Sequence, residues 1–303
     1  MIRTIATLQM RTFARQRMLH TTIGVTAGFA ALAGVLGWAS HQTIIGVYDE
    51  SSKLLAQRGQ AAPPNPFLLK PSLSMLANEI IYVTMIGALV AIVVGHIAIA
   101  EDESNGIGRL VFIRPIERSR YAVGKLSACA LLLGIAGTLC FVVSVGALTI
   151  VDRFPSGTDL TRLVAFYLLA WLYSMVWTLV GAIGVLVTRK RPLALLGSIS
   201  AWLTITFALP QFTSGLRPTQ SLNPIVDPVS TSQTLFRITA KARPYSLAEQ
   251  FKEAAGRVLS TAASESISQT RLRIAPIVAA LLILCLVAWQ LIERHDYSRS
   301  NPE

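Results

Sequence analysis

Residues that could take part in chemistry are concentrated in the segment 101–125, EDESNGIGRLVFIRPIERSRYAVGK. Its last fragment, Gly124-Lys125, hints at phosphate binding. A P-loop, however, requires Gly at the position of Ser119 and Ser or Thr at the position of Leu126. The sequence therefore predicts no ATP site of this type in the chain. The dense charges, with their Gly and Pro punctuation, instead indicate a segment that contacts another protein.

Other catalytic and metal-binding patterns are equally weak. The sequence contains no Gly-x-Ser-x-Gly, no His-Glu-x-x-His and no paired carboxylates within an apolar run. His96, Met85 and the cysteines Cys129, Cys140 and Cys285 do not have the spacing of metal ligands. We expect no metal site, no cofactor in this chain and no enzymatic activity of its own.

The charged segment lies between long apolar blocks. Hydrophobic residues make up 52% of the chain and charged residues 14%, and the apolar residues form blocks about as long as a bilayer is thick. Each block is continuously apolar rather than alternating, which indicates helices and not barrel strands. The predicted fold is an all-α transmembrane bundle with six membrane-spanning helices. The predicted spans are residues 21–40, 80–100, 127–150, 164–187, 192–209 and 274–291.

Lys and Arg in the short loops predict the orientation. They are concentrated before the first span, between the second and third spans, and between the fourth and fifth. The positive-inside rule therefore places both termini in the cytoplasm. The net charge of +11 is divided among these loops, with no basic face interleaved with aromatic residues. We expect contact with the lipid bilayer and not with nucleic acid.

The first twenty residues contain four Arg and no acidic residue. A transit peptide or a secretory signal would share this composition. The apolar run that follows is longer than a usual signal core, however, and Ile5, Leu8 and Phe13 leave an apolar edge on a basic helix. We predict a cytoplasmic interfacial helix over 1–20, followed by a single transmembrane domain over 21–303.

Within the 101–125 loop, the pattern predicts a short amphipathic helix. Gly106 can begin or turn it, Leu110, Val111 and Ile113 give it an apolar edge, and Pro115 ends it. This helix would lie on the cytoplasmic side of the second span.

At this loop the sequence resembles the permeases of type-2 ATP-binding-cassette transporters. Their corresponding loop has an acidic run, a Gly, an apolar stretch, and then Pro, Arg and Gly-Lys entering the next span. The matching residues here are Asp102, Glu103, Gly106, Leu110, Pro115, Arg118, Gly124 and Lys125. The family more often has Gly-Thr-Leu where this chain has residues 106–108. The overall layout of six spans, with the longest external segment before the sixth, is also similar.

The resemblance implies a role for each part of this loop. Residues 106–115 would be the coupling helix that docks on a separate cytoplasmic ATPase, and that partner would bind ATP and Mg. Asp102 and Glu103 would supply polar contacts or orient the loop, while Arg118 and Lys125 would anchor its exit at the lipid headgroups. The implied location is the bacterial inner (cytoplasmic) membrane. The implied function is a permease that exports a substrate or passes mechanical work to an external partner.

The resemblance also implies a pair of permeases, and we expect a homodimer. Gly24 and Gly28 form a small-xxx-small pair in the first span and are candidates for the contact with the second copy. Residues 222–224, Leu-Asn-Pro, with Asp227 are similar to the permeases linked to nitrous oxide reductase maturation. Asn-Pro is also a common turn initiator, so the pattern has a simple structural interpretation too.

The external segment 211–273 contains one further helical pattern. Ser246 followed by Glu249 is a capping box. Leu247, Phe251, Ala254 and Val258 then recur on one helical face. We predict an amphipathic helix over 246–260 that packs on the rim of the bundle, with binding to an external or periplasmic partner as the alternative.

A secondary transporter and a non-transporting membrane scaffold are the alternatives for the whole chain. Secondary transporters usually carry ionisable groups near the middle of the membrane. The predicted spans contain only His96, close to the cytoplasmic end. This observation favours the ATP-driven permease.

Overall fold

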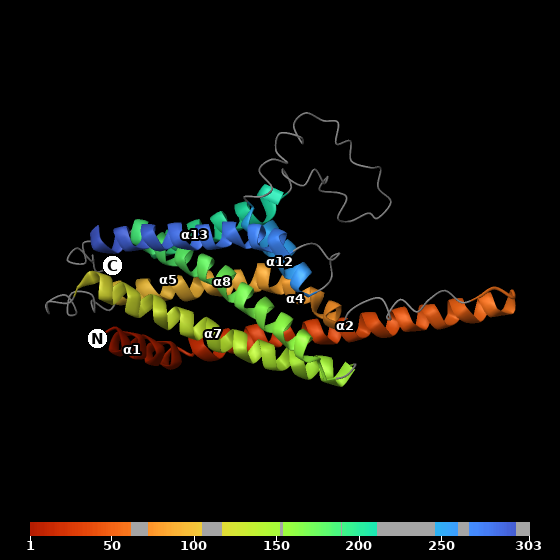
Figure 1. Ribbon diagram of the computed structural model, residues 1–303. Helices are drawn as coiled ribbons and strands as arrows, with labels where there is room; N and C mark the ends of the chain where they lie inside the picture. The colour runs from red at the N-terminus through yellow and green to blue at the C-terminus, as the bar shows by residue number, and fades with distance from the viewer. Residues whose placement is uncertain are drawn as a thin grey trace, which may run out of the picture.

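The computed structural model describes residues 1–61, 72–104, 117–151, 154–188, 190–210, 246–259 and 267–294. Figure 1 shows an elongated bundle of helices within these ranges. The elements are α1 (Ile2–Arg15), α2 (Met18–Gln57), η1 (Ser72–Leu76), α4 (Ala77–Tyr82), η2 (Val83–Gly87), α5 (Ala88–Ser104), α7 (Arg118–Val151), α8 (Gly157–Val187), α9 (Arg191–Leu203), η3 (Thr204–Ala208), α12 (Leu247–Val258) and α13 (Ile267–Arg294).

The predicted all-α transmembrane bundle is confirmed. Within the described ranges, six helical segments are long and apolar enough to cross a membrane. They are Met18–Gln57, Leu73–Glu101, Arg118–Val151, Gly157–Val187, Arg191–Ala208 and Ile274–Arg294. The second span begins earlier than predicted, because η1 and α4 precede residue 80. This earlier start brings a carboxylate, Glu79, into the span.

The crossing of α5 and α8 lies at the centre of the bundle. Gly95 of α5 lies directly against the backbone of Thr178, and Gly181 of α8 lies against the carbonyl of Ile92. A Cβ at either glycine would overlap a backbone atom of the other helix. The two helices can approach this closely only because both positions lack a side chain. Around the crossing, α8 contributes the fully buried Trp177.

The helix predicted at the N-terminus is present as α1, and it packs against α7; its position at the membrane interface stays a prediction. Phe13 is fully buried among Ala128, Cys129 and other apolar side chains of α5 and α7. Leu8, which was predicted to lie on the same apolar edge, is 60% exposed. The chain turns from α1 into α2 at Arg17, whose φ of 60° is the left-handed conformation that interrupts a helix.

The amphipathic helix predicted over 246–260 is present as α12. The Ser246 side chain accepts a hydrogen bond from the Glu249 backbone N–H and so caps the N-terminus of the helix. Phe251 is fully buried and stacks on Tyr173 of α8, with ring centroids 4.5 Å apart. The apolar face of α12 therefore packs on the bundle, as expected.

Helix α2 is much longer than the predicted first span. It contains 40 residues, which corresponds to a length of about 60 Å, whereas the hydrocarbon core of a bilayer is about 30 Å thick. In Figure 1 its C-terminal part, residues 41–57, runs well beyond the ends of the other helices. The side chains of this projection are mostly exposed or half-buried.

The ends of several helices lie together at the end of the bundle opposite this projection. Figure 1 shows α1, the C-terminal end of α5, the N-terminal end of α7 and the C-terminal end of α13 close to the two termini. An even number of spans requires this arrangement. It places the helices that flank the predicted coupling segment beside α1 and α13.

Candidate functional site

Two regions of the bundle contain polar side chains in positions that could serve a function. The first consists of the helix ends that flank the predicted coupling segment. Asp102 and Glu103 belong to the last turn of α5, which ends at Ser104. The next described helix begins at Arg118. Gly106, Leu110, Val111, Ile113 and Pro115 lie outside the described residues, as do residues 222–227.

Arg118 connects the start of α7 to the end of α13. Its Nη1 donates a hydrogen bond to the backbone carbonyl of Glu293, at a distance of 2.6 Å. The last carbonyls of a helix have no partner within the helix, and a cation near them is favourable. Arg118 therefore stabilises the C-terminal end of α13.

Lys125 differs from the expectation that it anchors the loop at the headgroups. The residue is only 3% exposed. Its Nζ donates a hydrogen bond of 2.6 Å to the carbonyl of Ala98 on α5 and lies 5.4 Å from the centroid of the Tyr121 ring. The inward position follows from the packing of α1, because Ile5 lies against the neighbouring Gly124. This part of α7 faces protein and not lipid headgroups.

A third polar contact connects α1 to the end of α5. Gln16, the residue that follows α1, donates a side-chain hydrogen bond to the carboxylate of Glu101. Three hydrogen bonds therefore attach the two helices that flank the segment 105–117 to each other and to two neighbours: α5 to α1, α7 to α5, and α7 to α13. A displacement of these helix ends would act on all of these elements together.

The second region surrounds Glu79 on α4, a residue that the sequence analysis missed. Glu79 is 3% exposed. Its Oε1 accepts a hydrogen bond from Ser144 of α7, and its Oε2 accepts one of 2.7 Å from the hydroxyl of Tyr167 on α8. The hydroxyls of Ser144 and Tyr167 are themselves 2.7 Å apart. A signal existed in the sequence, because Glu79 stands between the apolar residues Leu76 and Ile80 with no other charge nearby.

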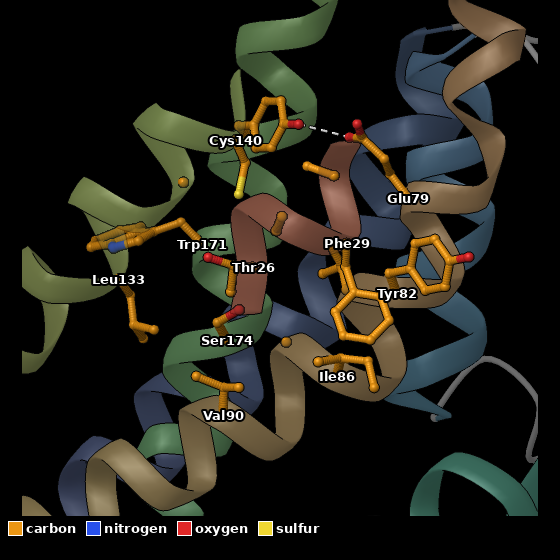
Figure 2. Close-up of a pocket in the computed structure, with 16 residues that line it drawn as sticks. Thr26, Phe29, Glu79, Tyr82, Ile86, Val90, Leu133, Cys140, Trp171 and Ser174 are labelled. Carbon is orange, nitrogen blue, oxygen red and sulfur yellow. Dashed lines mark hydrogen bonds between the residues drawn. The ribbon is translucent and has the colours of Figure 1, made fainter. Parts of the chain in front are cut away.

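A cavity of about 80 Å³ adjoins this carboxylate. Figure 2 shows side chains from α2, α4, η2, α5, α7 and α8 converging on it. Phe29, Tyr82, Tyr167 and Trp171 give the wall four aromatic rings. Thr26, Ser174 and Cys140 add small polar groups to the lining. The site is therefore largely apolar, with its polar groups few and separate.

An irregular turn forms part of the cavity wall. η2 is a π-helical turn between α4 and α5, and it contributes Val83, Ile86 and Gly87 to the lining. Such turns disturb the regular backbone hydrogen bonds and often occur at functional sites. The indole N–H of Trp202 donates a hydrogen bond of 3.3 Å to the carbonyl of Thr84 within the turn. The α9 helix thus supports the shape of the wall.

Gly24 and Gly28 occupy an open face of α2. A Cβ added at either position would meet no atom of the chain within 4 Å. Gly34 and Gly37 differ, because they lie against Ala147 and the backbone of Met75 within the same chain. The glycines selected from the sequence therefore leave a smooth surface that no described part of the chain covers.

Comparison with known proteins gives one family. The family described as "ABC-2 family transporter protein" matches residues 3–294. No curated protein matches the chain significantly. The matched range includes both polar regions, the six spans and α12.

Proposed function

The chain belongs to the ABC-2 transporter family and is a membrane-embedded permease subunit; from this premise we propose that a separate cytoplasmic ATPase docks on its 101–125 segment and drives export. The ATPase would bind ATP and Mg, and this chain would supply no catalytic residue. The proposal places both termini in the cytoplasm and the protein in the bacterial inner membrane. The family implies the ATPase partner, and the residue pattern of the loop favours this segment as its docking site.

The attachment of the flanking helices is the observation that supports this proposal most directly. Arg118 bonds to α13, Lys125 bonds to α5, and Gln16 bonds to Glu101 at the end of α5. A docked ATPase that moved the loop would therefore pull on several helices at once. A merely solvated loop would not need its flanks to be held in this way.

Secondary transport is the second candidate, and Glu79 is the observation that favours it. Secondary transporters usually carry a buried ionisable group within a span, and Glu79 is such a group that the sequence analysis did not find. The family match favours the ATP-driven permease. Export, rather than work on an external partner or a role in nitrous oxide reductase maturation, is the simplest form of the proposal.

Loss of the ATPase subunit is the expected result of changing the apolar edge of the coupling segment. The double change Leu110→Asp and Val111→Asp places two carboxylates where the proposed docking helix contacts its partner. We expect co-purification of an ATP-binding subunit with the tagged wild-type chain from mild detergent, and its loss with the double variant, because burying unpaired charges in an interface is costly.

A matched control adds the same charges at the other end of the bundle. Val47 and Leu54 are 60% and 58% exposed on the projecting part of α2. The double change Val47→Asp and Leu54→Asp should leave the ATPase subunit bound. Equal recovery of the ATPase with the Leu110/Val111 variant, at normal membrane insertion, would contradict docking at this segment.

The open face of α2 leads to a prediction about the proposed homodimer. Gly24→Leu with Gly28→Leu should shift the protein from dimer to monomer in a detergent-stable preparation, because close helix contact through small residues leaves no room for Leu. Gly46→Leu, at a glycine on the same helix that is also open, is the control. Mass photometry of the wild type and the two variants measures the ratio of dimer to monomer. An unchanged dimer fraction in the Gly24/Gly28 variant would place the contact elsewhere.

A further inference from the structure

The cavity beside Glu79 has a chemical character that restricts what it could bind. Among the described residues that line it are four aromatic rings, several aliphatic side chains and one acidic group, Glu79. Within the described part of the chain, the wall contains no Lys, Arg or His. Anionic ligands would meet only a carboxylate and hydroxyls. A ligand that complements this wall is apolar and either neutral or cationic.

The number of protons in the hydrogen-bonded ring around Glu79 determines the charge of its carboxyl group. Glu79, Ser144 and Tyr167 make three mutual hydrogen-bonding contacts. The two hydroxyls supply two protons for these contacts, so a closed ring needs a third proton on the carboxyl group. If the carboxylate is ionised and both hydroxyls donate to it, the contact between Ser144 and Tyr167 has no proton. In the empty cavity a proton on the carboxyl group therefore completes the ring, and the ionised form lacks that proton and leaves one of the three contacts without a hydrogen bond.

None of the described side chains that line the cavity can supply a positive charge. An ionised carboxylate inside a membrane span is costly unless a cation accompanies it. The aromatic rings would add to the attraction, because the faces of Phe, Tyr and Trp attract cations within about 6 Å of their centroids. Phe29 and Tyr82 already lie together, with ring centroids 5.1 Å apart.

We propose that this cavity binds a hydrophobic organic cation, with an ammonium group beside Glu79 and an apolar body against the aromatic rings, and that the carboxyl proton is released to solvent as the cation binds. A single water needs about 10–15 Å³ of such space, so a cavity of about 80 Å³ holds several waters or the charged end of an organic molecule. The proposal deepens the proposed function by naming a ligand class for the permease. Binding itself requires no ATPase, so the two proposals can fail separately.

The test compares two ligands with the same phenylbutyl skeleton, one with a charged ammonium group and one with a neutral hydroxyl group at its end. The full-length chain, without an ATPase, is reconstituted in nanodiscs of zwitterionic phosphatidylcholine, and empty nanodiscs correct for partition into lipid. Isothermal titration calorimetry then measures 4-phenylbutylamine, which is protonated at neutral pH, against 4-phenylbutan-1-ol. We expect the amine to bind at least about tenfold more tightly than the alcohol, because only the amine pairs with the carboxylate.

Two variants test whether the carboxylate of Glu79 causes the tighter binding of the amine. Glu79→Gln should weaken the amine at least about tenfold and leave the alcohol nearly unchanged, so that the preference disappears. Glu50→Gln removes an exposed carboxylate from the projecting part of α2 and should retain the wild-type preference. Equal binding of the two ligands by the wild-type protein would overturn the proposal without any variant. An amine preference that persists in folded Glu79→Gln would overturn the assignment to Glu79.

Discussion

Gly95→Ala is expected to destabilise the bundle by about 3 kcal/mol, the upper end of the usual cost of overpacking a core. The added methyl group would overlap the backbone carbonyl of Thr178 at the crossing of α5 and α8. Backbone atoms cannot rotate away as a flexible side chain can, so the two helices would have to separate. The measurement is the thermal unfolding midpoint in mild detergent, together with the yield of monodisperse protein after size exclusion.

Gly137→Ala is the matched control, because a Cβ at this glycine of α7 meets nothing within 4 Å. It should unfold like the wild type. Gly181→Ala should resemble Gly95→Ala, since it overlaps the carbonyl of Ile92 at the same crossing. If both changes act by separating one pair of helices, the double variant should lose less stability than the sum of the two. Wild-type stability of Gly95→Ala would show that the crossing is looser than described here.

Phe13→Ala is expected to detach α1 from the bundle. Removing a fully buried Phe costs about 3–5 kcal/mol, and here the loss falls on the contact of one terminal helix with α5 and α7. The open form of α1 should become more populated by two or more orders of magnitude. Limited trypsin digestion measures this change, because Arg11 and Arg15 are exposed on α1 but their peptide bonds can be cleaved only when the helix detaches and unfolds locally.

Leu8→Ala provides the control on the same helix. Leu8 is 60% exposed, so its removal reduces the hydrophobicity of α1 without opening the packed face. We expect trypsin to cleave this variant at the wild-type rate. Similar cleavage of the two variants would mean that α1 is held by general attraction to the membrane surface, and the contact with α7 would then be secondary.

The architecture could be predicted because its dominant signal is local. A run of apolar residues long enough to cross a bilayer can adopt few structures, since only a helix forms all of its backbone hydrogen bonds within one segment there. The same reasoning predicted α12, where the Ser246 and Glu249 cap and the apolar face are adjacent in sequence. The coupling segment was identified by resemblance, and its central residues stay predictions.

The site beside Glu79 could not be predicted in the same way. Its members come from α4, α7 and α8, so their contact is a property of packing and not of spacing. The span was also predicted to begin at Ile80, because a criterion that looks for uncharged runs stops at the first acidic residue. Glu79, whose hydrogen-bond partners are close in space but far away in sequence, therefore falls outside such a run. Lys125 was placed at the headgroups for a similar reason, since nothing near it in sequence reveals that α1 covers that face of α7.

Because α2 projects so far from the bundle, a small tilt of this helix produces a large displacement at its C-terminal end. Residues 41–57 carry the helix roughly 25 Å past the first predicted span at 1.5 Å per residue. A continuous helix transmits rotation along its whole length. With about 60 Å from end to end, a tilt of about 5° around Met18 would displace Gln57 by roughly 5 Å. Small rearrangements among the packed helices would thus be magnified at the tip, where a distance probe could detect motions too small to follow inside the bundle.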